Sequence, residues 1–447
     1  MKKRRVLWKP QNLLGHYIVA FFVGLVIGFK VLPVIIVATV FLLLLLVCIF
    51  TSIQGNVPAF FTFMPFAVYT EVYMRAEARW VPYLSIQYMF IVCFSALLFY
   101  QLKSKRYHSL AFVFLLIFTF IEFTNNLAPD NTALVRTTIV NSLALLMPII
   151  WASYYVLHPI LINKLLSNIK LATVYLAGIV FVAHLTGGID YGLYSSSASS
   201  NGMAPVQLSG YLGVGCSLLF LSIMNPEELK NRWVNVGVLG LSATVMVLTF
   251  SRGGLYFLCA VIALYIYYNR ANLGQYAKFL ILLPIAYIIY TYVVSSTGGM
   301  IVERYEQEGT SNRDILILAG YTLFLQDPLI GVGTGNYNTE IVKRDLFPVE
   351  SGPHNEFVRA AAEHGILGII FYWGFFLILI ITILRRRQPQ KQFAVYFYAL
   401  FCLISIHNGL KIGIQPLLMM IAVGTPTLFF KQQQHVRSKM LAKTRVA

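Results

Sequence analysis

Charged side chains are scarce in this chain. Of its 447 residues only 11% are Asp, Glu, Lys or Arg, while 58% are hydrophobic. A soluble domain needs more polar side chains than this to cover its surface. Many of the apolar runs are about as long as a bilayer is thick, roughly 17–25 residues. Membrane barrels show alternating segments of about ten residues instead, whereas a run such as 31–50 is uniformly apolar. We therefore expect an all-α, polytopic transmembrane helical bundle.

Cysteine is also rare, and its spacing excludes the usual uses of a thiol. The five cysteines lie in apolar runs and none belongs to a CxxC pair. This pattern is typical of small buried side chains, not of disulfides or metal ligands. The segments that we assign to the outer face contain no HExxH or similar metal-binding pattern. We expect neither a metal nor a cofactor.

Acidic residues are half as numerous as basic ones, 17 against 34, and the net charge is +17. The basic residues do not form a stripe with interleaved aromatics, so the excess does not indicate nucleic-acid binding. Most of them cluster in alternate short loops between apolar runs, which is the positive-inside pattern. That pattern predicts a multi-pass inner-membrane protein with both termini in the cytoplasm and with segment 296–363 on the outer side.

The apolar runs predict about 12–14 spans and three consecutive regions. Residues 1–295 would hold the first eleven spans and the Ser251–Gly254 motif, 296–363 would form a long outer loop with two short helices, and 364–447 would hold the last spans and a cytoplasmic tail. The fourteen predicted ranges are 13–29, 31–50, 57–71, 83–101, 108–124, 136–157, 170–186, 206–224, 233–250, 255–269, 278–295, 364–384, 392–408 and 412–430.

The long outer segment 296–363 has readable internal signals. Ser311 or Asn312 can cap a helix from Arg313 to Gln326, which Asp327-Pro328 would stop. After a glycine-rich turn, a second helix is expected to begin near Pro353 and to end at Gly365, because proline favours the first helical position and glycine the end. A second outer segment, 187–205, is rich in Ser and Gly and predicts a lid or a linker.

Arg252 stands between two predicted spans, in the sequence Ser251-Arg252-Gly253-Gly254. An arginine at membrane depth is costly, so it usually has a partner or a function. Gly253 and Gly254 would let a backbone or a bulky ligand approach. Arg252 is then either an anion-binding residue that faces a cavity or an interfacial arginine that reaches toward the headgroups.

Two residues of the outer loop are further candidates. Arg313 would begin the first loop helix, where its guanidinium and the free amides favour a phosphate, although a solvated arginine is the alternative. His354 would lie in the first turn of the second helix. A helix N-terminus disfavours the imidazolium, and a neutral imidazole can accept a proton from a sugar hydroxyl. A structural or capping histidine remains the alternative there.

The order of these motifs resembles the O-antigen ligase/polymerase family, which belongs to the GT-C-type membrane transferases. The resemblance runs from Thr249 to Gly368. It consists of the Ser-Arg-Gly-Gly stretch, the helix that Arg313 begins, Asp-Pro-Leu-Ile-Gly-Val-Gly-Thr-Gly-Asn-Tyr, and then His-Asn-Glu-Phe followed by Glu-His-Gly-Ile-Leu-Gly. Outside this stretch the chain matches the family only in having many spans.

The resemblance implies a metal-independent, inverting glycosyltransferase that uses an undecaprenyl-pyrophosphate-linked glycan as donor. Arg252 and Arg313 would bind the donor pyrophosphate, and His354 would activate the acceptor hydroxyl. Gly253, Gly254 and the loop residues Asn355, Glu356 and Glu363 would support the site, and the two glutamates are the alternative bases.

Four functions stay open at this point, three of them transferases. A ligase would use lipid A–core as the acceptor, a polymerase would use another lipid-linked glycan, and a protein O-oligosaccharyltransferase would use a protein side chain. From a different class, a lipid-linked glycan flippase or transporter could also bind a pyrophosphate lipid through arginines. The candidate residues all lie on the predicted outer side, which favours the transferase, and we lean toward the ligase.

Overall fold

A computed structural model describes most of the chain. The described residues are 13–100, 110–125, 132–155, 157–187, 189, 191–192, 195–225, 231–271, 274, 279–307, 309, 312–386, 388, 390–407, 409 and 413–424. Within them every regular element is helical and no strand occurs. The predicted all-α class is therefore confirmed. The end of the last predicted span, 412–430, and the predicted cytoplasmic tail lie outside the described residues.

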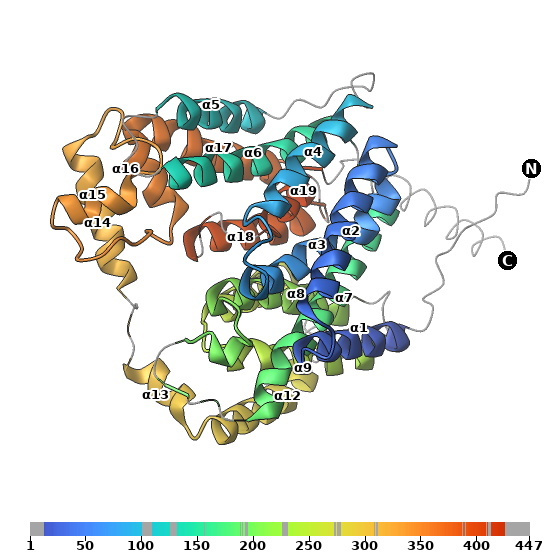
Figure 1. The fold of residues 1–447 in the computed structure, drawn as a ribbon. Coiled ribbons are helices and arrows are strands. Elements are labelled where there is room, and N and C mark those ends of the chain that lie inside the picture. The colour runs from blue at the N-terminus through green and yellow to red at the C-terminus, as the bar shows by residue number, and fades with distance from the viewer. Residues whose placement is uncertain are drawn as a thin grey trace, which may run out of the picture.

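Most of the predicted ranges coincide with an apolar helix, but the helix of the seventh range begins at Pro159 and not at 170, and the range 364–384 is divided among three helical elements. Figure 1 shows the arrangement of the apolar helices. In chain order they are α1 (Leu13–Gly28), α2 (Val34–Ile53), α3 (Val57–Glu77), α4 (Ser85–Phe99), α5 (Leu110–Thr124), α6 (Thr132–Tyr154), α7 (Pro159–Thr186), α8 (Pro205–Met224), α9 (Arg232–Leu248), α10 (Gly253–Asn269), α12 (Phe279–Ser296), α17 (Gly374–Leu384), α18 (Gln390–His407) and α19 (Gln415–Gly424). A short helical turn, η1 (Ala198–Ser200), precedes α8.

Not all of these helices are long enough to cross a bilayer by themselves. Among the described residues, five stretches have the length and composition of a span: Val34–Ile53, Thr132–Tyr154, Pro159–Thr186, Ala198–Met224 and Glu356–Leu384. A sixth would be formed if α12 and the next helix, which meet at a 97° bend, are counted together. Other apolar helices have 10–17 residues. These findings support a multi-pass membrane protein, whereas the number of crossings and their orientation stay predictions.

The helices pack through small residues at their closest approaches. Helix α1 lies along α7, and a Cβ atom built on Gly24 would come within 2.1 Å of the carbonyl oxygen of Tyr175. Helix α8 packs against both α9 and α10. There, a Cβ atom on Gly213 would lie 2.4 Å from the Cα atom of Gly254. Glycine is therefore needed at both crossings, because any side chain would push the backbones apart.

The loop between α12 and α17 contains more helices than predicted. They are α13 (Met300–Gln307), α14 (Arg313–Gln326), α15 (Tyr337–Lys343) and α16 (Glu356–Gly368), and a π-helical turn, η3 (Ile369–Trp373), joins α16 to α17. Figure 1 shows α14, α15 and α16 grouped at one end of the bundle. The predicted helix Arg313–Gln326 is confirmed at both ends. The predicted division at residues 295 and 363 stays a prediction, and α16 runs across the second boundary.

The glycine-rich turn of the loop serves to pack two backbones together. Gly331, Gly333 and Gly335 all have positive φ angles, between 69° and 92°. The amide of Gly333 donates to the carbonyl of Glu363 over 2.9 Å, and a Cβ atom on Gly331 would lie 2.3 Å from the backbone of Glu363. The turn thus lies directly on the C-terminal half of α16, which it fixes.

Gly365, the predicted end of the second loop helix, has φ 58° and ψ −140°. Only glycine adopts such a conformation easily. The helix is therefore kinked at Gly365, as a terminating glycine would produce, and a second helical stretch follows at once.

Candidate functional site

A cavity of about 730 Å³ lies where the α9–α10 turn meets the loop between α12 and α17. Its wall includes Arg252, Arg313 and His354, the three residues to which the sequence analysis gives the main roles. The other lining residues are Ser195, Val206, Ser251, Tyr256, Arg304, Gly309, Asn312, Asp314, Leu316, Ile317, Phe347, Val349, Ser351 and His407. Arginines outnumber acids on this wall among the described residues, so the cavity favours an anionic ligand.

Arg252 is held by the turn between two helices. The turn begins at Phe250, which has a positive φ of 58°, and Arg252 stands immediately before the first residue of α10. Its two terminal nitrogens donate to different backbone carbonyls of the loop, to Gly309 over 2.7 Å and to Arg304 over 3.0 Å. The guanidinium carbon also lies 5.1 Å from the ring centroid of Tyr305. Arg252 therefore links this turn to the loop, because its planar guanidinium can donate to two carbonyls at once.

The two glycines after Arg252 have different neighbours. A Cβ atom on Gly254 would lie 2.3 Å from the backbone oxygen of Ser209 in α8. The Ser209 hydroxyl accepts from the Gly254 amide over 2.9 Å and donates to the carbonyl of Ser251 over 3.0 Å. A Cβ atom on Gly253 would instead lie 2.6 Å from the ring of His407. Gly254 thus permits helix packing, and Gly253 leaves room for a side chain at the cavity.

Arg313 is the first residue of α14, as predicted. Asn312 stands at the cap position with φ 62°, but its side chain makes no capping hydrogen bond, and Ser311 lies outside the described residues. Burial lowers the pKa of the Arg313 guanidinium, and the positive charge of Arg252 lowers it further, against an opposing effect of Tyr256. Two cations that disfavour each other's charge in one cavity would both be stabilised by a bound anion.

His354 lies outside the helix in which we predicted it. It has a positive φ of 50°, and α16 begins two residues later, at Glu356. The prediction was wrong because Asn355, not Pro353, sets the start. The Asn355 side-chain oxygen accepts from the amides of Phe357 and Val358, over 3.0 and 3.3 Å, and asparagine is among the strongest N-cap residues. His354 is nevertheless half-buried and lines the cavity.

Comparison with known families adds an independent finding. Residues 237–373 match the family model described as O-antigen ligase. This region of the chain is similar to the O-antigen ligase family. The match runs from within α9 to the end of η3, so it includes the Ser251–Gly254 turn, the loop between α12 and α17 and the three predicted cavity residues. It confirms the resemblance derived from the motifs. No curated protein matches the chain.

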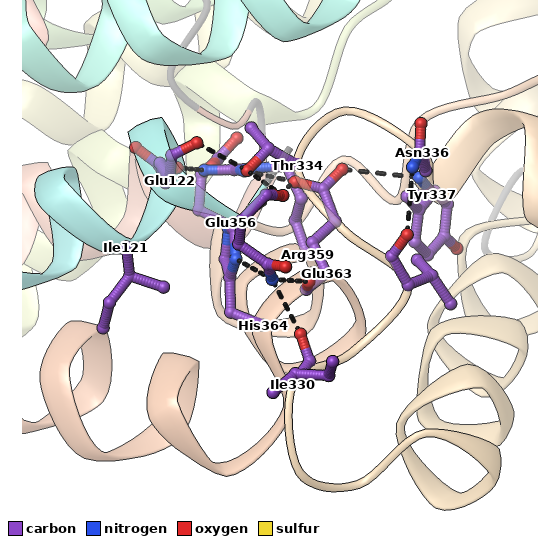
Figure 2. A network of polar contacts seen from close by, with 12 residues as sticks. Ile121, Glu122, Ile330, Thr334, Asn336, Tyr337, Glu356, Arg359, Glu363 and His364 are labelled. Atoms are coloured by element: carbon purple, nitrogen blue, oxygen red, sulfur yellow. Dashed lines mark hydrogen bonds and ion pairs between the residues drawn. The ribbon is translucent and has the colours of Figure 1, made fainter. Parts of the chain in front are cut away.

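Two acidic candidates of the matched region, Glu356 and Glu363, do not line the cavity. Glu356 and Glu363 are buried and bind Arg359, as Figure 2 shows, over 2.6 and 2.7 Å. The third nitrogen of Arg359 binds Glu122 of α5 over 2.8 Å. Neither loop glutamate is among the cavity-lining residues. Both glutamates therefore bind Arg359 within α16, and it is Arg359 that joins this helix to α5 through Glu122. Of the predicted bases, only His354 lines the cavity.

Further contacts fix the same loop to α5. The hydroxyl of Thr334 donates to the backbone oxygen of Glu122 over 2.7 Å, and the side-chain amide of Asn125 donates to the carbonyl of Ile330 over 2.7 Å. Asn125 also lies 3.2 Å from Nδ1 of the fully buried His364. No role could be assigned to Glu122 or Arg359 from the sequence. Glu122 is a single acid within an apolar run, and Arg359 is one of several cations on the predicted outer side.

Several residues with ionisable or aromatic side chains on the cavity wall were given no role from the sequence, among them Tyr256, Arg304 and His407. Tyr256 comes from α10, Arg304 from α13 and His407 from the end of α18, which lies outside the matched family region. His407 is a lone histidine at the predicted outer end of a span, and such a position gives no information about distant neighbours. Within the described residues, no group of three or more His, Cys, Asp or Glu side chains has the spacing of a metal site.

Proposed function

We propose that the chain is an inverting glycosyltransferase of the bacterial inner membrane. It would move a glycan from an undecaprenyl-pyrophosphate donor to an acceptor hydroxyl on the periplasmic face, with both termini in the cytoplasm. We assign it to the O-antigen ligase type, with lipid A–core as acceptor, because its loop motifs resemble those of ligases. One observation carries the proposal: Arg252, Arg313 and His354 come from three different segments and line one cavity.

The chemistry requires a base on one side and cations on the other. The His354 imidazole takes the proton of the acceptor hydroxyl as the hydroxyl oxygen forms a bond to the anomeric carbon. The bond between that carbon and the pyrophosphate oxygen breaks, and the electron pair leaves with the pyrophosphate. Arg252 and Arg313 stabilise the departing charge. Because attack and departure occur on opposite faces of the carbon, the configuration inverts.

The cation-rich wall supports this assignment of the donor. A pyrophosphate carries several negative oxygens, and guanidinium groups bind such oxygens through paired N–H donors. Burial and the neighbouring charge of Arg252 lower the pKa of the Arg313 guanidinium, and a bound anion would offset both effects. The remaining lining residues include Val206, Leu316 and Ile317, which offer apolar surface to a lipid or to a sugar face.

Deletion of the gene, followed by electrophoresis of the cell's glycans, tests the proposal. A ligase deletion should remove long chains from lipid A–core and leave full-length polymer on undecaprenyl pyrophosphate. Single lipid-linked repeats would instead indicate the polymerase, and donor confined to the cytoplasmic leaflet would indicate a flippase. An unchanged glycan pattern in the deletion strain would contradict all three.

A further inference from the structure

The ring of His407 lies between the two arginine-bearing segments of the cavity. It belongs to the last turn of α18, far along the chain from the Ser251–Gly254 turn and from the start of α14. One terminal nitrogen of Arg313 contacts Nδ1 of His407 and lies 3.0 Å from its Nε2. The imidazole ring also meets the ring of Tyr256 edge-on, with centroids 5.6 Å apart. Thus α10, α14 and α18 all meet at this side chain.

The contact with Arg313 requires that the contacted ring nitrogen of His407 carries no proton. A guanidinium has five N–H donors and no acceptor, so the imidazole nitrogen must accept the hydrogen bond. Only a neutral imidazole has an acceptor nitrogen. The hydrogen bond therefore occupies one donor of Arg313 and leaves its other N–H groups to bind a ligand in the cavity.

The first glycine of the motif is explained by the same ring. A Cβ atom on Gly253 would lie 2.6 Å from Cδ2 and 2.8 Å from Nε2 of His407, closer than van der Waals contact allows. The nearest atoms at Gly254 are different: they belong to Ser209 and Met246, and the closest is a backbone oxygen. An alanine at position 253 would therefore displace the imidazole specifically, whereas one at position 254 would disturb the contact of α10 with α8.

We propose that His407 is a positioning residue for Arg313 in the anion site, and that Gly253 exists in the motif to admit its ring. The proposal rests on the proposed function, since it assumes that the cavity takes a pyrophosphate. His407 would hold the guanidinium by accepting one hydrogen bond while Gly253 and Tyr256 fix the ring from the side of α10. The Ser-Arg-Gly-Gly turn would thereby contribute to the anion site twice. It provides Arg252, and its Gly253 leaves room for the His407 ring that orients Arg313.

Binding of inorganic pyrophosphate to the full-length purified protein, measured by titration calorimetry at fixed salt, tests the proposal. Loss of one hydrogen bond to a charged group predicts that His407→Ala weakens binding about tenfold. His407→Gln keeps a side-chain acceptor and should stay within about threefold of the wild-type affinity. Gly253→Ala should weaken binding as much as His407→Ala does.

The double variant gives the sharpest result. If Gly253→Ala acts only by displacing the ring, then Gly253→Ala combined with His407→Ala should bind no more weakly than His407→Ala alone. The matched control is Gly254→Ala, in which the added methyl group would clash with α8 and not with His407. Its loss of affinity should therefore multiply with the loss caused by His407→Ala. The proposal would be overturned if the losses of affinity in Gly253→Ala and His407→Ala multiplied in the double variant. It would also be overturned if His407→Ala bound pyrophosphate like the wild type. Should Gly253→Ala not fold, the comparison of His407→Ala with His407→Gln still decides.

Two further variants separate this inference from the proposed function. Arg252→Ala and Arg313→Ala should each weaken pyrophosphate binding strongly. Wild-type binding in both would refute the anion site itself, and the role of His407 with it. If both arginine variants lose binding while His407→Ala does not, only the positioning role is wrong.

Discussion

Arg359 of α16 binds Glu122 of α5 over 2.8 Å, although 237 residues separate them in the chain. The same guanidinium binds Glu356 and Glu363, and all four side chains are buried. Three carboxylates thus share one cation inside the protein. Since Glu122 comes from a different part of the chain, this cluster is a direct link between the outer loop and the membrane helices.

We predict that Arg359→Ala destabilises the protein by about 3–5 kcal/mol, because it leaves buried carboxylates without their cation. Glu122→Gln should cost less, since the other two carboxylates still neutralise Arg359 and the amide oxygen can still accept. Thermal unfolding of the purified variants in detergent measures both effects. Equal stability of Arg359→Ala and the wild type would show that the cluster does not hold the loop.

The cluster also shows where the sequence stops being informative. The helix Arg313–Gln326 was predicted at both ends because its signals are local: a polar residue before it and Asp327-Pro328 after it. The pairing of Glu122 with Arg359 depends on the fold, and no local pattern reports it. His407 was missed for the same reason, because its partners lie on other helices.

The error at His354 has a different cause. Pro353 and Asn355 both favour the start of a helix, but they predict starting positions that differ by a few residues. The prediction followed the proline, whereas the two amides bound by the Asn355 side chain set the start at Glu356. A capping side chain provides hydrogen bonds that proline cannot, so asparagine deserved the greater weight.

A second prediction concerns Tyr191, which stacks on Phe250 with ring centroids 5.3 Å apart. Phe250 has φ 58°, an unfavourable conformation for a bulky residue, so it needs support from its surroundings. The Tyr191 hydroxyl lies 2.6 Å from Nδ1 of His184, which fixes the ring. Loss of an aromatic pair costs about 0.5–1.5 kcal/mol. Tyr191→Ala should therefore lower glycan transfer roughly three- to tenfold by loosening the turn that carries Arg252.

Tyr191→Phe is the control for this turn, because it keeps the stacked ring and removes only the hydroxyl. It should transfer glycan better than Tyr191→Ala at equal amounts of protein in the membrane. Full activity in Tyr191→Ala would mean that the conformation of Phe250 is maintained without the stack.

Third, lysine should replace neither Arg252 nor Arg313 well. Arg252 uses two nitrogens to reach the carbonyls of Gly309 and Arg304, and a single ammonium group cannot reproduce that fork. We expect Arg252→Lys and Arg313→Lys to lose about tenfold or more in transfer at wild-type expression, measured by restoration of long-chain glycans in a deletion strain. Normal transfer in both lysine variants would show that the two arginines act only in folding or in membrane orientation.

A fourth prediction follows from the positions of the arginines in the cavity. If Arg252 and Arg313 stabilise the departing pyrophosphate, turnover needs no divalent cation. Purified enzyme with donor and acceptor should keep its rate in excess EDTA. A rate that disappears with EDTA and returns with magnesium or manganese would disprove the arginine-based account of leaving-group stabilisation.

The last prediction concerns the base. A sugar hydroxyl is a poor nucleophile until its proton begins to leave, and a positioned base typically supplies about 10²–10⁴-fold in rate. His354 is half-buried and lines the cavity. His354→Ala should therefore fold and bind pyrophosphate like the wild type, yet lose at least about 10²-fold in transfer. Single-turnover transfer from a lipid-linked donor measures this loss separately from binding.

Two variants decide whether His354 acts as a base or only supports the loop. Glutamine can hydrogen-bond but cannot take the proton, so His354→Gln should remain as inactive as His354→Ala. Asn355→Ala removes the cap of α16, which costs about 1 kcal/mol, and should lower transfer far less. Near-normal transfer in His354→Gln would make His354 a structural residue. The base would then have to be another group of the same cavity wall, because Glu356 and Glu363 are bound to Arg359.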